Sequence, residues 1–180
     1  MINFFYRLIR TYKNWINRDS FEKAIKLDQL KVYVHHESAK RRYTDTLLIS
    51  CVDFRFRSAI EDLMCEVLHL TDNYDEVVLP GASLSLVEKI YPDWERTLEE
   101  VIEVLQKLHH IKQIIFLDHR DCSAYKLIKG EKSVSTKACE TKTHAEVFKE
   151  VRKIMHKKFP ELKIYTLLIG LDGVVDNIKG

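Results

Sequence analysis

Apolar residues along the chain follow two patterns, which predict two kinds of element. Short apolar runs bounded by polar or turn-forming residues are typical of buried strands, and they occupy residues 46–51, 75–79, 113–118 and 162–169. Between them, apolar residues recur at steps of three and four, which is typical of amphipathic helices. These helical stretches are residues 58–68, 92–108 and 144–159. Because strands alternate with helices, we expect an α/β fold with a mainly parallel sheet of four to five strands flanked by helices.

Residues 1–18 carry a separate amphipathic pattern in which basic side chains lie among apolar ones. The basic residues are Arg7, Arg10, Lys13 and Arg18. We interpret this stretch as an arm helix that packs on the domain or on a partner subunit; a membrane-surface helix and a targeting segment are the alternatives. The chain is therefore divided into an N-terminal helical arm, residues 1–30, and a single α/β domain, residues 31–180.

Two of the predicted strands end in side chains that bind metals or move protons. The first is followed by Cys51-Val-Asp53-Phe-Arg55, and the third by His119-Arg-Asp-Cys122. Because the carboxyl ends of parallel strands meet at one edge of a sheet, we expect these side chains to converge on one crevice. We predict that Cys51, His119 and Cys122 form a three-ligand metal site.

Zinc is the metal that this ligand set favours, because two thiolates and one imidazole suit its borderline-soft character. Three protein ligands leave the fourth tetrahedral position open to water or substrate, as in catalytic zinc sites. The role of Asp53 has two alternatives. Its carboxylate either binds the metal as a fourth ligand and closes the site, or pairs with Arg55 and leaves the site open.

The two motifs resemble those of the β-class carbonic anhydrases, in which Cys-x-Asp-x-Arg follows one strand and His-x-x-Cys follows a later one. The resemblance covers roughly residues 40–178 and includes the strand-like Glu76–Leu79 and Asp121 before Cys122. It implies the strand order 2-1-3-4 and zinc as the cofactor. It also implies a homodimer or dimer-based oligomer, in which N-terminal helices wrap the neighbouring subunit.

The chain departs from the family pattern around the expected pocket. Residues 79–83, Leu-Pro-Gly-Ala-Ser, stand where the family usually has Arg-Asn-Ala-Gly after its second strand. Asp118 replaces the usual glycine before the ligand histidine, and Ser123 replaces the glycine after the second cysteine. For Asp118 we expect a solvated position at the end of its strand. The departures alter the wall of the pocket and leave the predicted metal ligands in place.

The resemblance implies reversible hydration of carbon dioxide to bicarbonate through metal-bound hydroxide. Asp53 and Arg55 are the predicted catalytic residues: Asp53 accepts the hydrogen bond of the water, and Arg55 holds Asp53 by a bidentate pair. The apolar Leu79 and Pro80 suit an alternative substrate such as carbon disulfide or carbonyl sulfide. A second alternative is a non-catalytic, zinc-stabilised protein with Asp53 as a permanent fourth ligand. A thiol redox function is weaker, because the sequence has no Cys-x-x-Cys.

Charge and cysteine content limit the remaining classes of function. The net charge of the 180-residue chain is only +2, which does not indicate a nucleic-acid partner. The chain holds 4 cysteines and no evident secretory signal, so we expect reduced thiols and a cytoplasmic location. No apolar run reaches the roughly 18 residues of a membrane span. We interpret Cys65 as a buried helix residue and Cys139 as an incidental thiol in a surface loop, residues 129–143.

Overall fold

The structure is a computed structural model that describes residues 42–89 and 91–178. The predicted amphipathic helix at residues 1–18, and with it the whole of the proposed arm at residues 1–30, lies outside the described residues. The division into an arm and one domain therefore stays a prediction.

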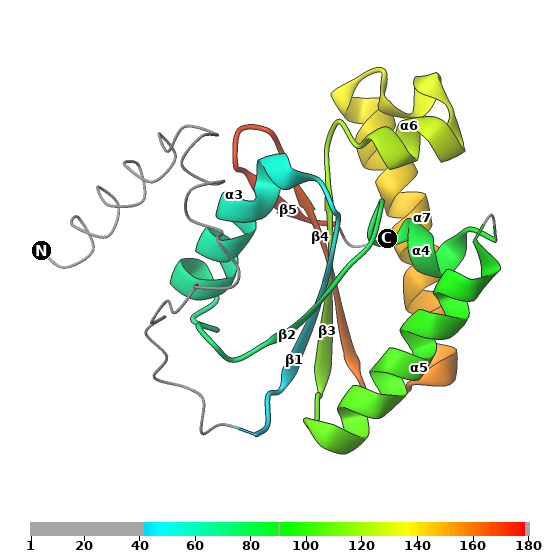
Figure 1. Cartoon of the computed structure of the whole chain (residues 1–180). Helices are drawn as coiled ribbons and strands as arrows, with labels where there is room; N and C mark the ends of the chain where they lie inside the picture. The colour runs from blue at the N-terminus through cyan, green and yellow to red at the C-terminus, as the bar shows by residue number, and fades with distance from the viewer. Residues whose placement is uncertain (1–41, 90, 179–180) are drawn as a thin grey trace, which may run out of the picture. The chain divides into compact units, whose positions relative to one another are not determined.

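A five-stranded sheet forms the centre of the fold (Figure 1). Its strands are β1 (Thr46–Ser50), β2 (Asp75–Val78), β3 (Gln113–His119), β4 (Lys163–Ile169) and β5 (Val175–Asn177). The order is β2-β1-β3-β4-β5. The first four strands are parallel, and β5 pairs antiparallel with β4. The expected mainly parallel sheet with the order 2-1-3-4 is confirmed, and β5 is the additional edge strand.

Helical segments connect the strands and cover both faces of the sheet. The segments are η1 (Phe54–Phe56), α3 (Arg57–Asp62), η2 (Leu63–Val67), α4 (Leu84–Val87), α5 (Pro92–Leu108), α6 (Ser123–Lys129), η3 (Glu131–Val134) and α7 (Lys137–Lys158). Figure 1 shows α3 on one side of the sheet and α4, α5 and α7 on the other. This is the three-layer arrangement that alternating strands and helices predict.

The buried residues of neighbouring strands explain this layering, because successive side chains of a strand point to opposite faces. In β1, Leu47 and Ile49 join a core formed with α4, α5, α6 and α7, whereas Leu48 joins a core formed with η1, α3 and η2. Phe116 and Leu117 of β3 divide in the same way. The central strands are therefore buried on both faces, and their ends are fixed in place by two packed layers.

The prediction of a surface loop over residues 129–143 is wrong for residues 137–143, which belong to helix α7. Helix α7 begins at Lys137, directly after Thr136, whose hydroxyl accepts a hydrogen bond from the Cys139 amide at 3.1 Å. The buried stripe of α7 starts with the polar residues Glu140 and His144 before it turns apolar. A stripe that begins with polar residues lacks the hydrophobic periodicity from which helices are predicted, and the helix start was missed for that reason.

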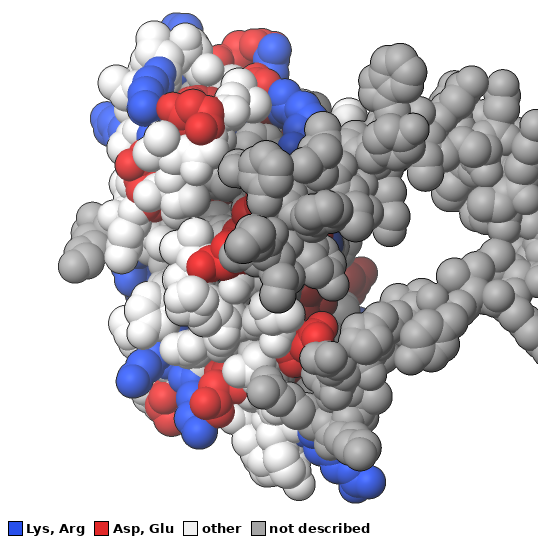
Figure 2. Space-filling model, turned by 90° about the vertical axis from the view of Figure 1, so that its left-hand side faces the viewer, with Lys and Arg blue, Asp and Glu red and all other residues white. Residues whose placement is uncertain are grey.

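Charged side chains of both signs lie on the surface. Figure 2 shows one face of the molecule, where basic and acidic side chains lie side by side at the upper and lower ends and mostly uncharged ones, with a few acidic and basic ones, lie between them. A mixed face of this kind does not present the single-sign field that attracts a polyanion. Among the described helices, none is long and apolar enough to cross a membrane.

Candidate metal centre

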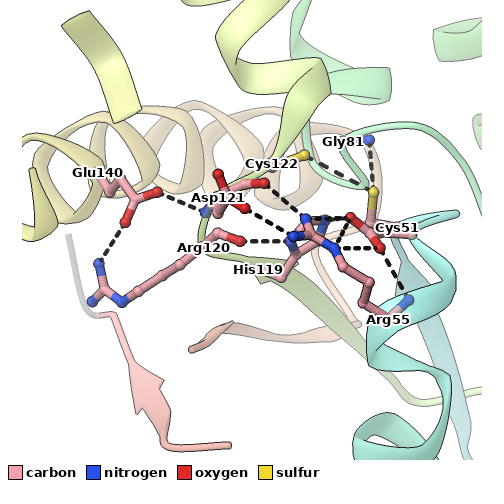
Figure 3. Close-up of polar contacts among 9 residues, drawn as sticks. Cys51, Arg55, Gly81, His119, Arg120, Asp121, Cys122 and Glu140 are labelled. Carbon is pink, nitrogen blue, oxygen red and sulfur yellow. Dashed lines mark hydrogen bonds and ion pairs between the residues drawn. The ribbon is translucent and has the colours of Figure 1, made fainter. Parts of the chain in front are cut away.

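Cys51 follows β1 directly and lies buried at the carboxyl edge of the sheet, with 4% of its surface exposed. The Gly81 amide donates a hydrogen bond to its Sγ at 3.3 Å, and the Cys122 Sγ lies 4.0 Å away (Figure 3). Hydrogen bonds to sulfur stabilise the thiolate form. Cys51 is therefore held between the end of β3 and the turn that follows β2.

His119 is the last residue of β3, and its ring is fixed by two contacts. Its Nδ1 lies 2.8 Å from the Arg120 carbonyl oxygen. Because a carbonyl only accepts, Nδ1 carries the proton and Nε2 keeps its lone pair in the neutral ring. The Phe56 ring packs against the imidazole with a centroid distance of 4.3 Å. This arrangement presents Nε2 to the site in the form that binds metals.

A tight turn brings Cys122 back toward His119. Asp121 has a φ of 55°, in the left-handed region, which Asp adopts more readily than most residues. The Asp121 amide donates to Glu140 Oε1 of α7 at 2.7 Å, and the same carboxylate lies 3.5 Å from the Arg120 guanidinium (Figure 3). Cys122 then precedes the first residue of α6. The turn thereby places the second thiol beside the first.

The Cys51 Sγ, a ring nitrogen of His119 and the Cys122 Sγ all lie within 4.8 Å of one another, and all three residues are buried. Two sulfurs bound to one tetrahedral zinc ion at about 2.3 Å each are about 3.8 Å apart, close to the observed 4.0 Å. The His119 Nε2 is buried and has no hydrogen-bond partner among the described residues. The donor set and its spacing fit one zinc ion.

The ionisation of the two thiols also fits a cation. The hydrogen bond from Cys122 lowers the pKa of Cys51 to about 4, whereas the neighbouring Cys51 and burial raise the pKa of Cys122 above its ordinary value. Two thiolates this close repel each other in a buried site. A divalent ion supplies the positive charge that lets both sulfurs ionise together.

The partly buried Asp53 and the exposed Arg55 form a polar pair at the rim of the three donors. Asp53 Oδ2 lies 3.8 Å from the His119 Nε2. The Arg55 Nε lies 3.0 and 3.1 Å from the two Asp53 carboxylate oxygens, and Nη2 lies 2.7 Å from Oδ2. Arg55 also donates to the Asp121 side chain at 2.8 Å and to its backbone oxygen at 3.0 Å. The hydrogen bonds from Arg55 lower the pKa of Asp53 to about 2.

The structure thus brings together all five residues that the sequence singled out, and it adds contacts that sequence reasoning missed. The pairing of Asp53 with Arg55 is present; their catalytic roles, and the metal-binding roles of the other three, stay predictions. The missed residues are Gly81, which donates to Cys51, and Glu140, which supports the turn at Asp121. Of these two residues, only Gly81 could be recognised from the local sequence, because Pro80-Gly81 marks a turn.

The expectation that Asp118 is solvated is wrong. Asp118 is 1% exposed and accepts hydrogen bonds from the Ser83 amide at 3.0 Å and from the Tyr125 hydroxyl. The His144 Nδ1 lies 3.0 Å from its second oxygen. The donors come from three separate segments of the chain, so no local pattern around residue 118 could reveal them.

Comparison with protein families and curated sequences gives three matches. Residues 41–179 match a family model described as "Putative carbonic anhydrase". An uncharacterized protein of Rickettsia bellii is 53% identical over 150 residues, which is 83% of this chain and 91% of that protein. An uncharacterized protein of Rickettsia conorii is 51% identical over 150 residues, which is 83% of this chain and 80% of that protein.

Solved structures share the fold at low sequence identity. The carbonic anhydrase from Streptococcus mutans has a TM-score of 0.51 and 16% identity, and the match covers 89% of this chain and 96% of that one. The β-carbonic anhydrase CafA of Aspergillus fumigatus has a TM-score of 0.51 and 13% identity, with 97% and 90% covered. At this identity the likeness shows a common fold and nothing finer.

Proposed function

This chain belongs to the carbonic anhydrase family whose model matches it, and from that premise we propose that it catalyses the reversible hydration of carbon dioxide to bicarbonate. Cys51, His119 and Cys122 hold the zinc ion on which the reaction depends. The observation that carries the proposal is the convergence of these three donors at the sheet edge, with the Asp53 carboxylate 3.8 Å from the His119 Nε2.

Asp53 orients the attacking water by accepting its hydrogen bond. When bound, zinc lowers the pKa of a coordinated water to about 7 and so supplies a nucleophile at neutral pH. Because Arg55 holds the pKa of Asp53 at about 2, this carboxylate is ionised throughout the neutral range. It therefore acts as a fixed acceptor and does not take up the proton itself.

Arg55 keeps Asp53 at the rim of the site. A guanidinium that binds both carboxylate oxygens fixes the carboxylate plane, and Asp121 anchors the guanidinium from the other side at 2.8 Å. This pairing supports the open arrangement, in which Asp53 faces the water, over a permanently closed site with Asp53 as fourth ligand. The non-catalytic alternative requires Asp53 to leave Arg55.

A second substrate class is supported by the wall that follows β2. Leu79 and Pro80 are partly exposed, and they lie in the turn whose Gly81 amide binds the Cys51 sulfur at 3.3 Å. Two apolar residues directly before the amide that bonds Cys51 suit carbon disulfide or carbonyl sulfide better than an ion such as bicarbonate. Comparison of carbon dioxide, carbon disulfide and carbonyl sulfide as substrates in one assay distinguishes the two substrate classes.

Two side chains next to the site support an oligomer. Val52 is 50% exposed and Phe54 is 84% exposed, although both flank Asp53 at the metal centre. Exposed apolar side chains that join into a larger apolar surface mark protein–protein contacts, and we propose that Val52 and Phe54 belong to one. We propose that the protein forms a homodimer or an oligomer built from dimers. We also place it in a compartment that keeps thiols reduced, such as the cytoplasm. Sedimentation of wild type and Phe54→Ser measures the subunit contact.

The proposal is tested by measuring zinc content and carbon dioxide hydration of wild type, Asp53→Ala and Asp93→Ala. Asp93 lies on α5 with 83% of its side chain exposed and serves as the matched control. We expect stoichiometric zinc in all three and a loss of hydration in Asp53→Ala alone. A wild type with full zinc and no hydration at pH values on either side of about 7, the pKa of zinc-bound water, removes the hydratase proposal.

A further inference from the structure

Asp118 is a buried carboxylate that joins three segments of the chain around the metal centre. Its Oδ1 accepts the Ser83 amide at 3.0 Å, and its Oδ2 accepts the Tyr125 hydroxyl of α6. The His144 Nδ1 of α7 lies 3.0 Å from Oδ2. A buried carboxylate is stable when such donors surround it. Asp118 therefore has a defined set of contacts, none of which is a metal ligand.

The Leu79–Ser83 turn, whose Ser83 amide bonds to Asp118, contains a strained residue, Ala82. Gly81 has a φ of 72° and Ala82 a φ of 41°, and a left-handed conformation is unfavourable for a residue with a Cβ. Strained residues persist only where the surrounding contacts over-determine them. The Ala82 amide bonds to the Leu79 oxygen at 3.0 Å, which closes the turn internally. The Ser83 amide has Asp118 as its partner, which anchors the turn to the end of β3.

The same turn contacts the metal centre. The Gly81 amide donates to the Cys51 Sγ at 3.3 Å, two residues before the Ser83 amide that Asp118 accepts. Gly81 itself is confined, because a Cβ there would lie 2.9 Å from Leu84 Cδ1 and 3.1 Å from the Ala124 Cβ of α6. The Gly81 amide and the Ser83 amide thus belong to one short turn, of which one end bonds Cys51 and the other bonds Asp118.

We propose that Asp118 is a positioning residue of the metal centre, which holds the Leu79–Ser83 turn so that the Gly81 amide stays bonded to the Cys51 sulfur. The inference rests on the proposed zinc-binding function of Cys51, His119 and Cys122. Groups that bond to metal ligands orient them, and their loss typically weakens metal binding by about 10- to 100-fold. Asp118 acts on the ligand Cys51 indirectly, through the backbone of the Leu79–Ser83 turn.

The contacts on Oδ2 have a separate role. Burial, together with the charge of Asp118, raises the pKa of Tyr125 well above its ordinary value, so its hydroxyl remains a donor. Tyr125 and His144 pack ring against ring at a centroid distance of 3.9 Å. These groups fix the Asp118 side chain against α6 and α7. Loss of the Tyr125 hydroxyl should therefore affect stability while leaving the turn anchored through Oδ1.

The test compares two substitutions at one position. Ser83→Pro removes the amide donor, and the φ of −59° at Ser83 suits a proline ring. Ser83→Ala is the matched control, because it keeps the amide and removes a hydroxyl that has no partner among the described residues. The metal-free proteins are loaded with Co²⁺, and the thiolate-to-cobalt absorption and the affinity are measured. A thiolate that loses a hydrogen bond absorbs at longer wavelength, because its lone pair rises in energy.

We expect Ser83→Pro to bind Co²⁺ about 10- to 100-fold more weakly, with the absorption moved to longer wavelength, whereas Ser83→Ala and Tyr125→Phe match wild type. Wild-type affinity and absorption in Ser83→Pro would overturn the proposal. If Ser83→Pro does not fold, Asp118→Leu and Asp118→Asn give the same test, because the asparagine oxygen still accepts the Ser83 amide and the leucine cannot. Equal spectra and affinities in that pair would also overturn it. Failure of wild type to bind Co²⁺ or Zn²⁺ refutes the proposed function instead.

Discussion

Arg55 binds both oxygens of the Asp53 carboxylate, with its Nε at 3.0 and 3.1 Å and its Nη2 at 2.7 Å. The Asp53 Oδ1 also accepts the Arg55 backbone amide at 3.0 Å and so caps η1. The carboxylate is thus held by the side chain and by the main chain of the same residue. This double contact fixes the distance of 3.8 Å between Asp53 Oδ2 and the His119 Nε2.

Arg55→Ala should lower carbon dioxide hydration by about 10- to 100-fold without loss of zinc, because the freed carboxylate no longer faces the water. Arg57→Ala is the matched control, since Arg57 binds Glu76 at 2.8 Å, whereas the guanidinium bound to Asp53 is that of Arg55. Stopped-flow hydration and metal analysis of both variants provide the measurement. Equal activity in the two variants would contradict the assigned role of Arg55.

Cys122→Ser should lose stoichiometric zinc, because a serine hydroxyl does not replace a thiolate as a zinc ligand at neutral pH. Cys139→Ser should keep it, since Cys139 is a partly buried thiol near the start of α7 and lies outside the cluster of donors. Atomic emission on the purified proteins gives the metal content. Retention of full zinc by Cys122→Ser would remove that residue from the ligand set.

Glu76 should make the free energy of unfolding depend on acid pH. Burial raises the pKa of Glu76, but hydrogen bonds from Arg57 and Ser50 outweigh it, and the pKa is lowered from the ordinary 4.5. The unfolded chain therefore binds the proton more readily, so the contribution is present above pH 4.5 and is lost as the pH falls through the folded-state pKa.

Glu76→Gln should accordingly destabilise the protein by about 1 kcal/mol at neutral pH, with a smaller difference in acid. Urea unfolding at neutral pH and below pH 4.5 measures this. If the difference in unfolding free energy between wild type and Glu76→Gln grew in acid, the stabilising role assigned to the ionised Glu76 would be contradicted.

Gly81→Ala should destabilise the protein by about 2–4 kcal/mol, because it combines left-handed strain with overpacking against Leu84 and Ala124. Gly130→Ala places a Cβ on another positive-φ glycine without a steric contact: Gly130 has a φ of 86° and a ψ of 161°, a region that is essentially restricted to glycine, and a Cβ there meets nothing within 4 Å. It should cost roughly 1–3 kcal/mol from backbone strain alone. Chemical denaturation of the metal-free proteins compares the two variants, and a loss at Gly81 no larger than that at Gly130 would contradict the overpacking.

Local patterns predicted the sheet and the candidate metal centre. The apolar runs identified β1 and β3, and the resemblance supplied their order. Because parallel strands end at one edge, Cys51 and His119 could be placed together although they lie in separate parts of the sequence. Apart from the strand order, these inferences use only strand periodicity and the residues at strand ends.

The buried polar contacts could not be predicted in this way. Asp118 lies near the end of the apolar strand β3, and its partners Tyr125 and His144 lie 7 and 26 residues further along the chain. Whether a carboxylate is solvated or buried depends on which helices cover it, and that is a property of the tertiary packing. Glu140 was missed for the same reason, since its partner Asp121 belongs to another element.

The zinc anomalous signal in crystals of the zinc-loaded protein tests the proposed metal centre most directly. We expect one ion bound by the sulfurs of Cys51 and Cys122 at about 2.3 Å and by the His119 Nε2 at about 2.0–2.1 Å. A zinc ion bound elsewhere, or a site in which these three atoms do not share an ion, would contradict the proposed ligand set.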